Sequence, residues 1–165
     1  MIGSILLLAY VTAARLVELW FANRNTRQLM ARGATEHAPG HYPFIVVMHA
    51  AWIVGLWWLG WNRPISLPWL APFVLLQGLR FWVFATLGSR WTARIITVPD
   101  DVLVTRGPYR FLRHPNYVVV VGEIAVLPMV FGLWAFALVF SALNAAALFV
   151  RIRAENQALA AFRRG

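Results

Sequence analysis

Long apolar runs separated by short polar stretches dominate this chain. Five such runs stand out, at residues 2–21, 43–61, 67–87, 117–131 and 133–150. Several of them approach the roughly 20 residues that a helix needs to cross ~30 Å of hydrocarbon. Because a bilayer offers backbone groups no water to bond, each run is predicted to be a transmembrane helix.

Composition supports the same class of protein. Hydrophobic residues make up 61% of the chain and charged residues only 13%, with a mean hydropathy of +0.65. A soluble domain of 165 residues could not bury so much apolar surface, whereas lipid tails solvate it directly. The first run has no basic segment before it and is too long for a secretory signal, so we expect it to remain as a span. The absence of cysteine excludes disulfides, thiolate nucleophiles and cysteine-bound zinc.

The positive charges gather on one side of the predicted membrane. The net charge of +9 comes from arginines, which crowd the segments 23–41, 88–116 and 151–165. The other side has only Arg63. Short basic loops stay in the cytoplasm, so we expect the N-terminus outside and the C-terminus in the cytosol. Because these arginines flank spans and form no basic domain, nucleic-acid binding is not expected.

These observations predict an all-α integral membrane protein with five transmembrane helices. The fourth run is short, and Gly132 separates it from the fifth, so the two are expected to form a tight C-terminal helical hairpin. A short hairpin beside a long polar loop favours a cleft that opens to the cytosol. The chain is interpreted as one membrane domain, in which residues 1–87 supply three helices and residues 88–165 supply a loop, the hairpin and a cytosolic tail helix.

Several polar side chains fall inside the predicted spans: Arg15, Glu18, Gln77, Arg80, Glu123 and Asn144. Charged groups in membrane helices are costly and normally face a partner or an aqueous cavity. Arg15 and Glu18 are three residues apart on one helix face and are expected to pair. Arg80 either extends its side chain to the membrane–water interface or pairs with Glu123. Glu123 either pairs helices or lines an active site. Asn144 is expected to hydrogen-bond between helices.

The stretch RGPYRFLRHPNYV, at residues 106–118, is the first candidate for chemistry. A basic membrane anchor followed by a helix-starting proline would explain its arginines. It would not explain His114, which Pro115 restricts to extended geometry, or the flanking Tyr109 and Tyr117. A proline in the first helical turn leaves nearby N–H groups free for a ligand. Aromatic rings, a restricted backbone and free donors together suit a nucleotide.

The second candidate is RIRAEN, at residues 151–156. Arg151 and Glu155 are four residues apart and therefore share a helix face. The spacing alone fits an ordinary surface ion pair. The position is more informative, because the hairpin returns this pair to the loop that contains His114.

Taken together, LVTRGPYRFLRHPNYV, the hairpin and RIRAEN resemble the isoprenylcysteine carboxyl methyltransferase family of membrane enzymes. The resemblance covers residues 91–159. The segment at residues 15–52 is similar to a short bacterial branch of that family. It implies a helical bundle that binds S-adenosylmethionine in a cytosol-facing pocket and needs no metal. The implied cofactor contacts are Val102, Leu103, Val104, Tyr109, His114, Pro115, Asn116, Tyr117 and Glu155, and Arg151 is the implied catalytic residue that faces the substrate oxygen.

Two departures from the family pattern bear on the pocket. Where eukaryotic members carry a histidine just before LVT, this chain has Asp100 and Asp101. Those members also continue past the Arg/Glu helix, whereas this sequence ends at Gly165. We therefore expect one wall of the pocket, and with it the substrate, to differ.

The activity implied by the resemblance is O-methylation of a lipophilic carboxylate or acidic hydroxyl, such as an isoprenylcysteine-like acid, an alkylpyrone or an alkylresorcinol. An activated methyl group needs chiefly a positioned oxygen, which Arg151 is suited to bind. The acceptor would enter from the bilayer, among membrane lipids. Two alternatives remain open: an NADPH-dependent membrane reductase of the sterol-reductase type, whose members share an RHPxY-like motif, and a non-enzymatic lipid-binding membrane protein.

Overall fold

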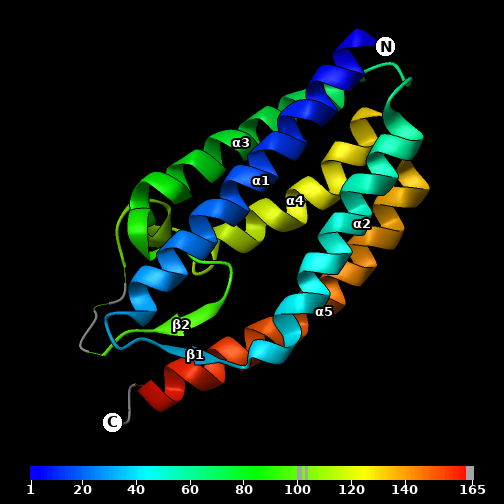
Figure 1. Cartoon of the computed structure of the whole chain (residues 1–165). Helices are drawn as coiled ribbons and strands as arrows, with labels where there is room; N and C mark the ends of the chain where they lie inside the picture. The colour runs from blue at the N-terminus through cyan, green and yellow to red at the C-terminus, as the bar shows by residue number, and fades with distance from the viewer. Residues whose placement is uncertain (100–101, 103, 163–165) are drawn as a thin grey trace.

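Five helices make up most of the computed structural model, which describes residues 1–99, 102 and 104–162. They are α1 (Ile2–Met30), α2 (Tyr42–Gly60), α3 (Leu67–Leu87), α4 (Pro115–Val130) and α5 (Trp134–Phe162). Short 3₁₀ turns occupy Pro39–His41, Gly88–Arg90 and Gly107–Arg110. The prediction of an all-α membrane protein with five helices is confirmed, and Figure 1 shows the two termini at opposite ends of the bundle.

Helix lengths divide the bundle into four long members and one short one. Within the described residues, α1, α2, α3 and α5 are long and apolar enough to cross a membrane. Helix α4 has 16 residues, and at ~1.5 Å per residue it extends about 24 Å. It ends at a tight turn in which Gly132 adopts a φ of 70° and donates to the Met129 carbonyl. The hairpin between α4 and α5 is therefore as tight as the sequence predicts.

Helices α1 and α5 both continue beyond the predicted spans. The predicted spans ended at residues 21 and 150, whereas the helices reach Met30 and Phe162. In α5 the added turns fall in the segment predicted as a separate tail helix, which the structure joins to the span without a break. The additional turns contain arginines and other polar residues, which are compatible with a helix once it has left the hydrocarbon. The ends of apolar runs thus mark the lipid boundary rather than the helix boundary.

Two short strands tie the polar loops together. Strand β1 (Thr35–His37) pairs antiparallel with β2 (Ile95–Thr97), so that Thr35 lies opposite Thr97. We call this two-stranded sheet the ribbon. The His37 Nε2 lies 2.7 Å from the Thr97 hydroxyl, and Arg94 forms an ion pair of 2.9 Å with Glu36. Both segments lie between the predicted spans and were interpreted as irregular connections, which is wrong, because they form strands. The ribbon packs beside α5, as Figure 1 shows, and links the end of α1 to the loop before α4.

The apolar core connects all five helices. Its buried members include Leu8 on α1, Trp52 on α2, Phe73 on α3, Leu127 on α4 and Ala147 on α5. Figure 1 shows α2 beside α5, and the two pack against each other.

Helices α3 and α4 approach closely. A Cβ added at Gly122 would lie 2.7 Å from the Leu76 side chain, and the Ser66 amide donates to the Val130 carbonyl at 2.8 Å. These contacts hold the middle and the C-terminal end of α4 against α3 and the residue that precedes it.

Candidate functional site

The loop before α4 is held against α3 by a glycine. Gly107 has a φ of 62°, and a Cβ there would lie 2.3 Å from the Thr86 hydroxyl oxygen. The backbone of His114 has φ −134° and ψ 66°, outside the helical region, as a following proline requires. Its ring stacks on that of Tyr117, with 5.1 Å between ring centroids and 18° between planes. The histidine is thus fixed by backbone and ring stacking together.

The start of α4 offers one free backbone donor. Pro115 has no N–H, and the amides of Tyr117 and Val118 both donate to the His114 carbonyl, at 3.0 and 3.3 Å. Among the residues that the structure describes, no side chain caps this helix end. In the described part of the chain the Asn116 N–H has no hydrogen bond, so it is available to an anionic or carbonyl oxygen.

The Tyr117 hydroxyl joins the two sequence motifs. It donates to Glu155 Oε2 and accepts a hydrogen bond of 3.0 Å from Arg151 Nε. His114 Nδ1 lies 3.9 Å from the other Glu155 oxygen. Arg151 and Glu155 therefore meet through the tyrosine instead of forming the plain surface ion pair that their spacing allowed. The predicted convergence of His114, Tyr117, Arg151 and Glu155 is present in the fold.

The remaining predicted contacts lie in the loop before this cluster. Burial raises the pKa of Tyr109 to about 12, and the Glu155 carboxylate acts in the same direction.

Val104 is partly buried, whereas Val102 is 78% exposed and its carbonyl accepts from Arg90 Nη1. Leu103, like Asp100 and Asp101, lies outside the described residues. Their roles toward a cofactor stay predictions.

A cavity of about 380 Å³ opens beside this cluster, and we call it the inner cavity. Its wall is mostly apolar, and all five helices contribute to it. Tyr117 and Arg151 line it, and so do Leu16 of α1 and Val54 of α2, which are 63% and 65% exposed. The inner cavity therefore opens between α1 and α2 toward the surrounding lipid. Tyr117 also lines a separate groove between α3 and α5 that contains His114.

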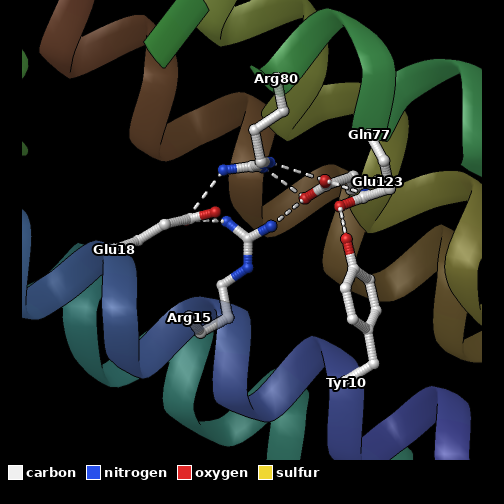
Figure 2. A network of polar contacts seen from close by, with 6 residues as sticks. All are labelled: Tyr10, Arg15, Glu18, Gln77, Arg80 and Glu123. Atoms are coloured by element: carbon white, nitrogen blue, oxygen red, sulfur yellow. Dashed lines mark hydrogen bonds and ion pairs between the residues drawn. The ribbon is translucent and has the colours of Figure 1, made fainter. Parts of the chain in front are cut away.

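A network of buried charges borders the inner cavity (Figure 2). Arg15 pairs with Glu18 at 2.5 Å and with Glu123 at 2.6 Å. Arg80 pairs with Glu18 at 2.9 Å and also with Glu123. Gln77 donates to Glu123 at 2.6 Å and accepts from the Tyr10 hydroxyl at 3.1 Å, as the dashed lines in Figure 2 show. We call these six residues the charge network, in which two guanidinium groups balance two carboxylates.

The charge network decides between the alternatives that the sequence left open. Arg15 and Glu18 pair as predicted, and Arg80 pairs with Glu123 instead of extending to the interface. Glu123 joins α1, α3 and α4, which is the helix-pairing role. The prediction for Asn144 was wrong, because its side chain has no hydrogen bond among the described residues, is 2% exposed and lines the inner cavity.

The histidine that lines the inner cavity was missed altogether. His49 lies on α2, lines the cavity, and its Nδ1 is 2.8 Å from the Ile45 carbonyl oxygen. The signal was present in the sequence, since it is a histidine within an apolar run. Within the described ranges, no group of three or more His, Asp or Glu side chains is arranged to hold a metal ion.

Five apolar helices, a polar cluster at the base of a helical hairpin and a cavity open to lipid define an integral membrane protein with one candidate site. Residues 69–161 match the model of the isoprenylcysteine carboxyl methyltransferase (ICMT) family, and the chain belongs to this family. The match supports a membrane methyltransferase-type function. The resemblance read from the two motifs is therefore confirmed.

Bacterial relatives agree with a short branch of the family. The chain is 35% identical over 168 residues to the uncharacterized protein YpbQ of Bacillus subtilis, covering 93% of this chain and 95% of YpbQ. An uncharacterized protein of Haemophilus influenzae is 24% identical, with 92% of this chain and 91% of that protein covered. The cobalt-zinc-cadmium resistance protein CzcN of Cupriavidus metallidurans is 41% identical over 51 residues, or 30% of this chain and 24% of CzcN. No solved structure matches the chain.

Proposed function

We propose that this protein is an S-adenosylmethionine-dependent O-methyltransferase that acts in the membrane on a lipophilic carboxylate or acidic hydroxyl. Family membership supports methyl transfer. The observation that carries the proposal is the Tyr117 hydroxyl, which links the loop motif to Arg151 and Glu155 at the wall of an apolar cavity. The site thus combines groups suited to a polar cofactor with space suited to a lipid.

The residues around His114 fit the chemistry of S-adenosylmethionine. Its adenine suits the stacked rings of His114 and Tyr117, and its carboxylate suits the free Asn116 N–H at the start of α4. Glu155 offers a carboxylate for ribose hydroxyls or for the ammonium group. The proposed cofactor contacts are Val102, Leu103, Val104, Tyr109, His114, Pro115, Asn116, Tyr117 and Glu155. When bound, the cofactor supplies a methyl group already activated by the positive sulfur.

The protein's own task is to position the acceptor oxygen. Arg151 donates through Nε to Tyr117, and among the described residues its two Nη atoms have no hydrogen bond. Arg151 lines the inner cavity, so these Nη atoms are suited to bind an anionic acceptor oxygen and aim it. The apolar wall excludes water and accepts the hydrocarbon part of the acceptor. Removing Arg151 should therefore affect turnover more than cofactor binding.

The acceptor is expected to reach the site from within the membrane, through the opening between α1 and α2. The arginine distribution supports a cytosolic site and an N-terminus outside. The bacterial relatives support a bacterial inner membrane as the location. The proposed partners are this acceptor and the surrounding lipids, without nucleic acid and without a metal.

Calorimetric titration in mild detergent tests the proposal. The wild type is expected to bind S-adenosylmethionine and S-adenosylhomocysteine, and His114→Ala is expected to lose that binding. Arg153→Ala is the control and should bind both compounds as the wild type does. Arg153 is on α5, like Arg151, but its guanidinium carbon lies over the Phe149 ring, 4.1 Å from the ring centroid. Binding of NADPH alone would move the protein to the reductase class. Binding of none of the three compounds would favour the non-enzymatic alternative.

A further inference from the structure

His49 presents a free proton acceptor to the inner cavity. Its Nδ1 lies 2.8 Å from the Ile45 carbonyl, and a carbonyl oxygen only accepts, so the hydrogen of the neutral ring is assigned to Nδ1. The lone pair then belongs to Nε2. In the described part of the chain no group donates to this nitrogen. A molecule in the cavity that carries a hydrogen on oxygen would complete the bond.

Asn144 presents a second unsatisfied group to the same cavity. Its side chain is 2% exposed and makes no hydrogen bond with any described residue. Its amide is accessible from the cavity, where a ligand hydroxyl or a water can pair with it. His49 comes from α2 and Asn144 from α5, two helices that pack together. On a mostly apolar wall, the cavity therefore presents these two polar side chains in addition to Tyr117, Arg151 and the charge network.

The hydrogen-bonding capacity of His49 and the charges around the cavity favour a hydroxyl over a carboxylate as the acceptor. A carboxylate has no hydrogen to give to His49 Nε2, whereas a phenolic or enolic hydroxyl has one. The guanidinium groups of Arg15 and Arg80 are already engaged by Glu18 and Glu123, so neither is available to bind an acid, and Arg151 is left to bind the oxygen anion as it develops. The exposed aliphatic rim between α1 and α2 suits an alkyl chain.

We propose that His49 and Asn144 bind the hydroxyl acceptor of the methyl-transfer reaction, and that His49 is its general base. This inference rests on the proposed function. The acceptor O–H bond breaks as its proton moves to Nε2, and the oxygen forms a bond to the methyl carbon of the sulfonium donor. The carbon–sulfur bond breaks with its electron pair on sulfur, which leaves a neutral thioether and an aryl or enol methyl ether. The imidazolium then releases the proton to water.

The test compares two long-chain acceptors that differ in ionisation. An alkylphenol is un-ionised at neutral pH and needs a base, whereas the corresponding alkyl dinitrophenol is almost fully ionised and does not. For His49→Gln we expect methylation of the alkylphenol to fall by roughly 10²–10⁴-fold, the usual contribution of a general base, with little change for the dinitrophenol. His37→Gln is the control, since that histidine bonds Thr97 in the ribbon. Equal losses for both acceptors in His49→Gln would overturn the assignment.

Binding without a methyl donor provides an independent readout. Asn144→Leu keeps the size of the side chain but removes its amide, and we expect it to weaken alkylphenol binding about tenfold, as loss of a buried hydrogen bond does. If the wild type transferred no methyl group to any acceptor, the proposed function would fail while this binding experiment still decided the site. Alkylphenol affinity that is equal in the wild type, His49→Gln and Asn144→Leu would rule out the His49 and Asn144 site.

Discussion

Replacing Glu123 by leucine should be the most damaging single substitution in the charge network. The Glu123 carboxylate is 3% exposed and accepts four hydrogen bonds, one from Gln77, one from Arg15 and two from Arg80. Without it, two buried guanidinium groups share the single carboxylate of Glu18. The substitution therefore removes contacts and also leaves an uncompensated positive charge in the membrane.

The decrease in the free energy of unfolding distinguishes lost hydrogen bonds from an unpaired charge. Hydrogen bonds between membrane helices average about 0.6 kcal/mol, so four lost bonds alone would cost about 2.4 kcal/mol. Removing one partner of a buried ion pair costs about 3–5 kcal/mol, because the remaining charge is left unpaired. We expect Glu123→Leu to fall in this higher range. The double variant Arg80→Met with Glu123→Leu should be more stable than the single variant, since Arg15 and Glu18 then balance.

Unfolding free energies from a detergent titration would measure these differences, with tryptophan fluorescence as the signal. Glu36→Leu is a matched control, because it breaks the partly exposed pair with Arg94 and should cost at most about 1 kcal/mol. A double variant as unstable as Glu123→Leu, or less stable, would refute the charge-balance reasoning. Hydrogen bonding would then be the larger contribution.

Three further predictions concern the site. Glu155→Ala should weaken S-adenosylhomocysteine binding about tenfold or more, because hydrogen bonds to charged groups contribute about 1.5–3 kcal/mol, and equal affinity in calorimetry would remove Glu155 from the cofactor site. Arg151→Ala should lower the turnover number more than cofactor affinity, and the reverse pattern in kinetics and calorimetry would contradict its acceptor role. Tyr109 has its pKa raised from 10.0 to about 12, so its contribution to stability should be present below pH 10 and lost between pH 10 and 12. The ultraviolet titration of wild type minus Tyr109→Phe checks this, and a phenolate that forms near pH 10 would contradict it.

The apolar runs predicted the helices because a bilayer leaves the backbone no other means of satisfying its hydrogen bonds. The same reasoning placed the His114 loop beside Arg151, since a tight hairpin at Gly132 returns α5 to the start of α4. The ribbon was not predictable in this way. Its strands TEH and IIT are three residues each, which is too short for an alternating pattern to be recognised.

The polar interior was predictable by residue but not by arrangement. The free-energy cost of a charge in the bilayer predicts that Arg15, Glu18, Arg80 and Glu123 are paired. Their spacing in the sequence does not predict that the two pairs form one network. Asn144 shows the converse, because a polar residue in a span was assigned to helix pairing whereas the structure directs it to a cavity. Which neighbour a buried side chain meets depends on helix rotation, and one sequence does not determine that rotation.

Helix α4 is about 6 Å shorter than the ~30 Å hydrocarbon layer that the other helices can cross. A bilayer accommodates such hydrophobic mismatch by thinning locally, at a cost of fractions of a kcal/mol per Å. The surrounding lipid should therefore be thinnest where the His114 loop meets α4. Reconstitution in lipids of shorter acyl chains would relieve the mismatch at this helix alone, so membrane thickness is itself a variable to which the site should respond.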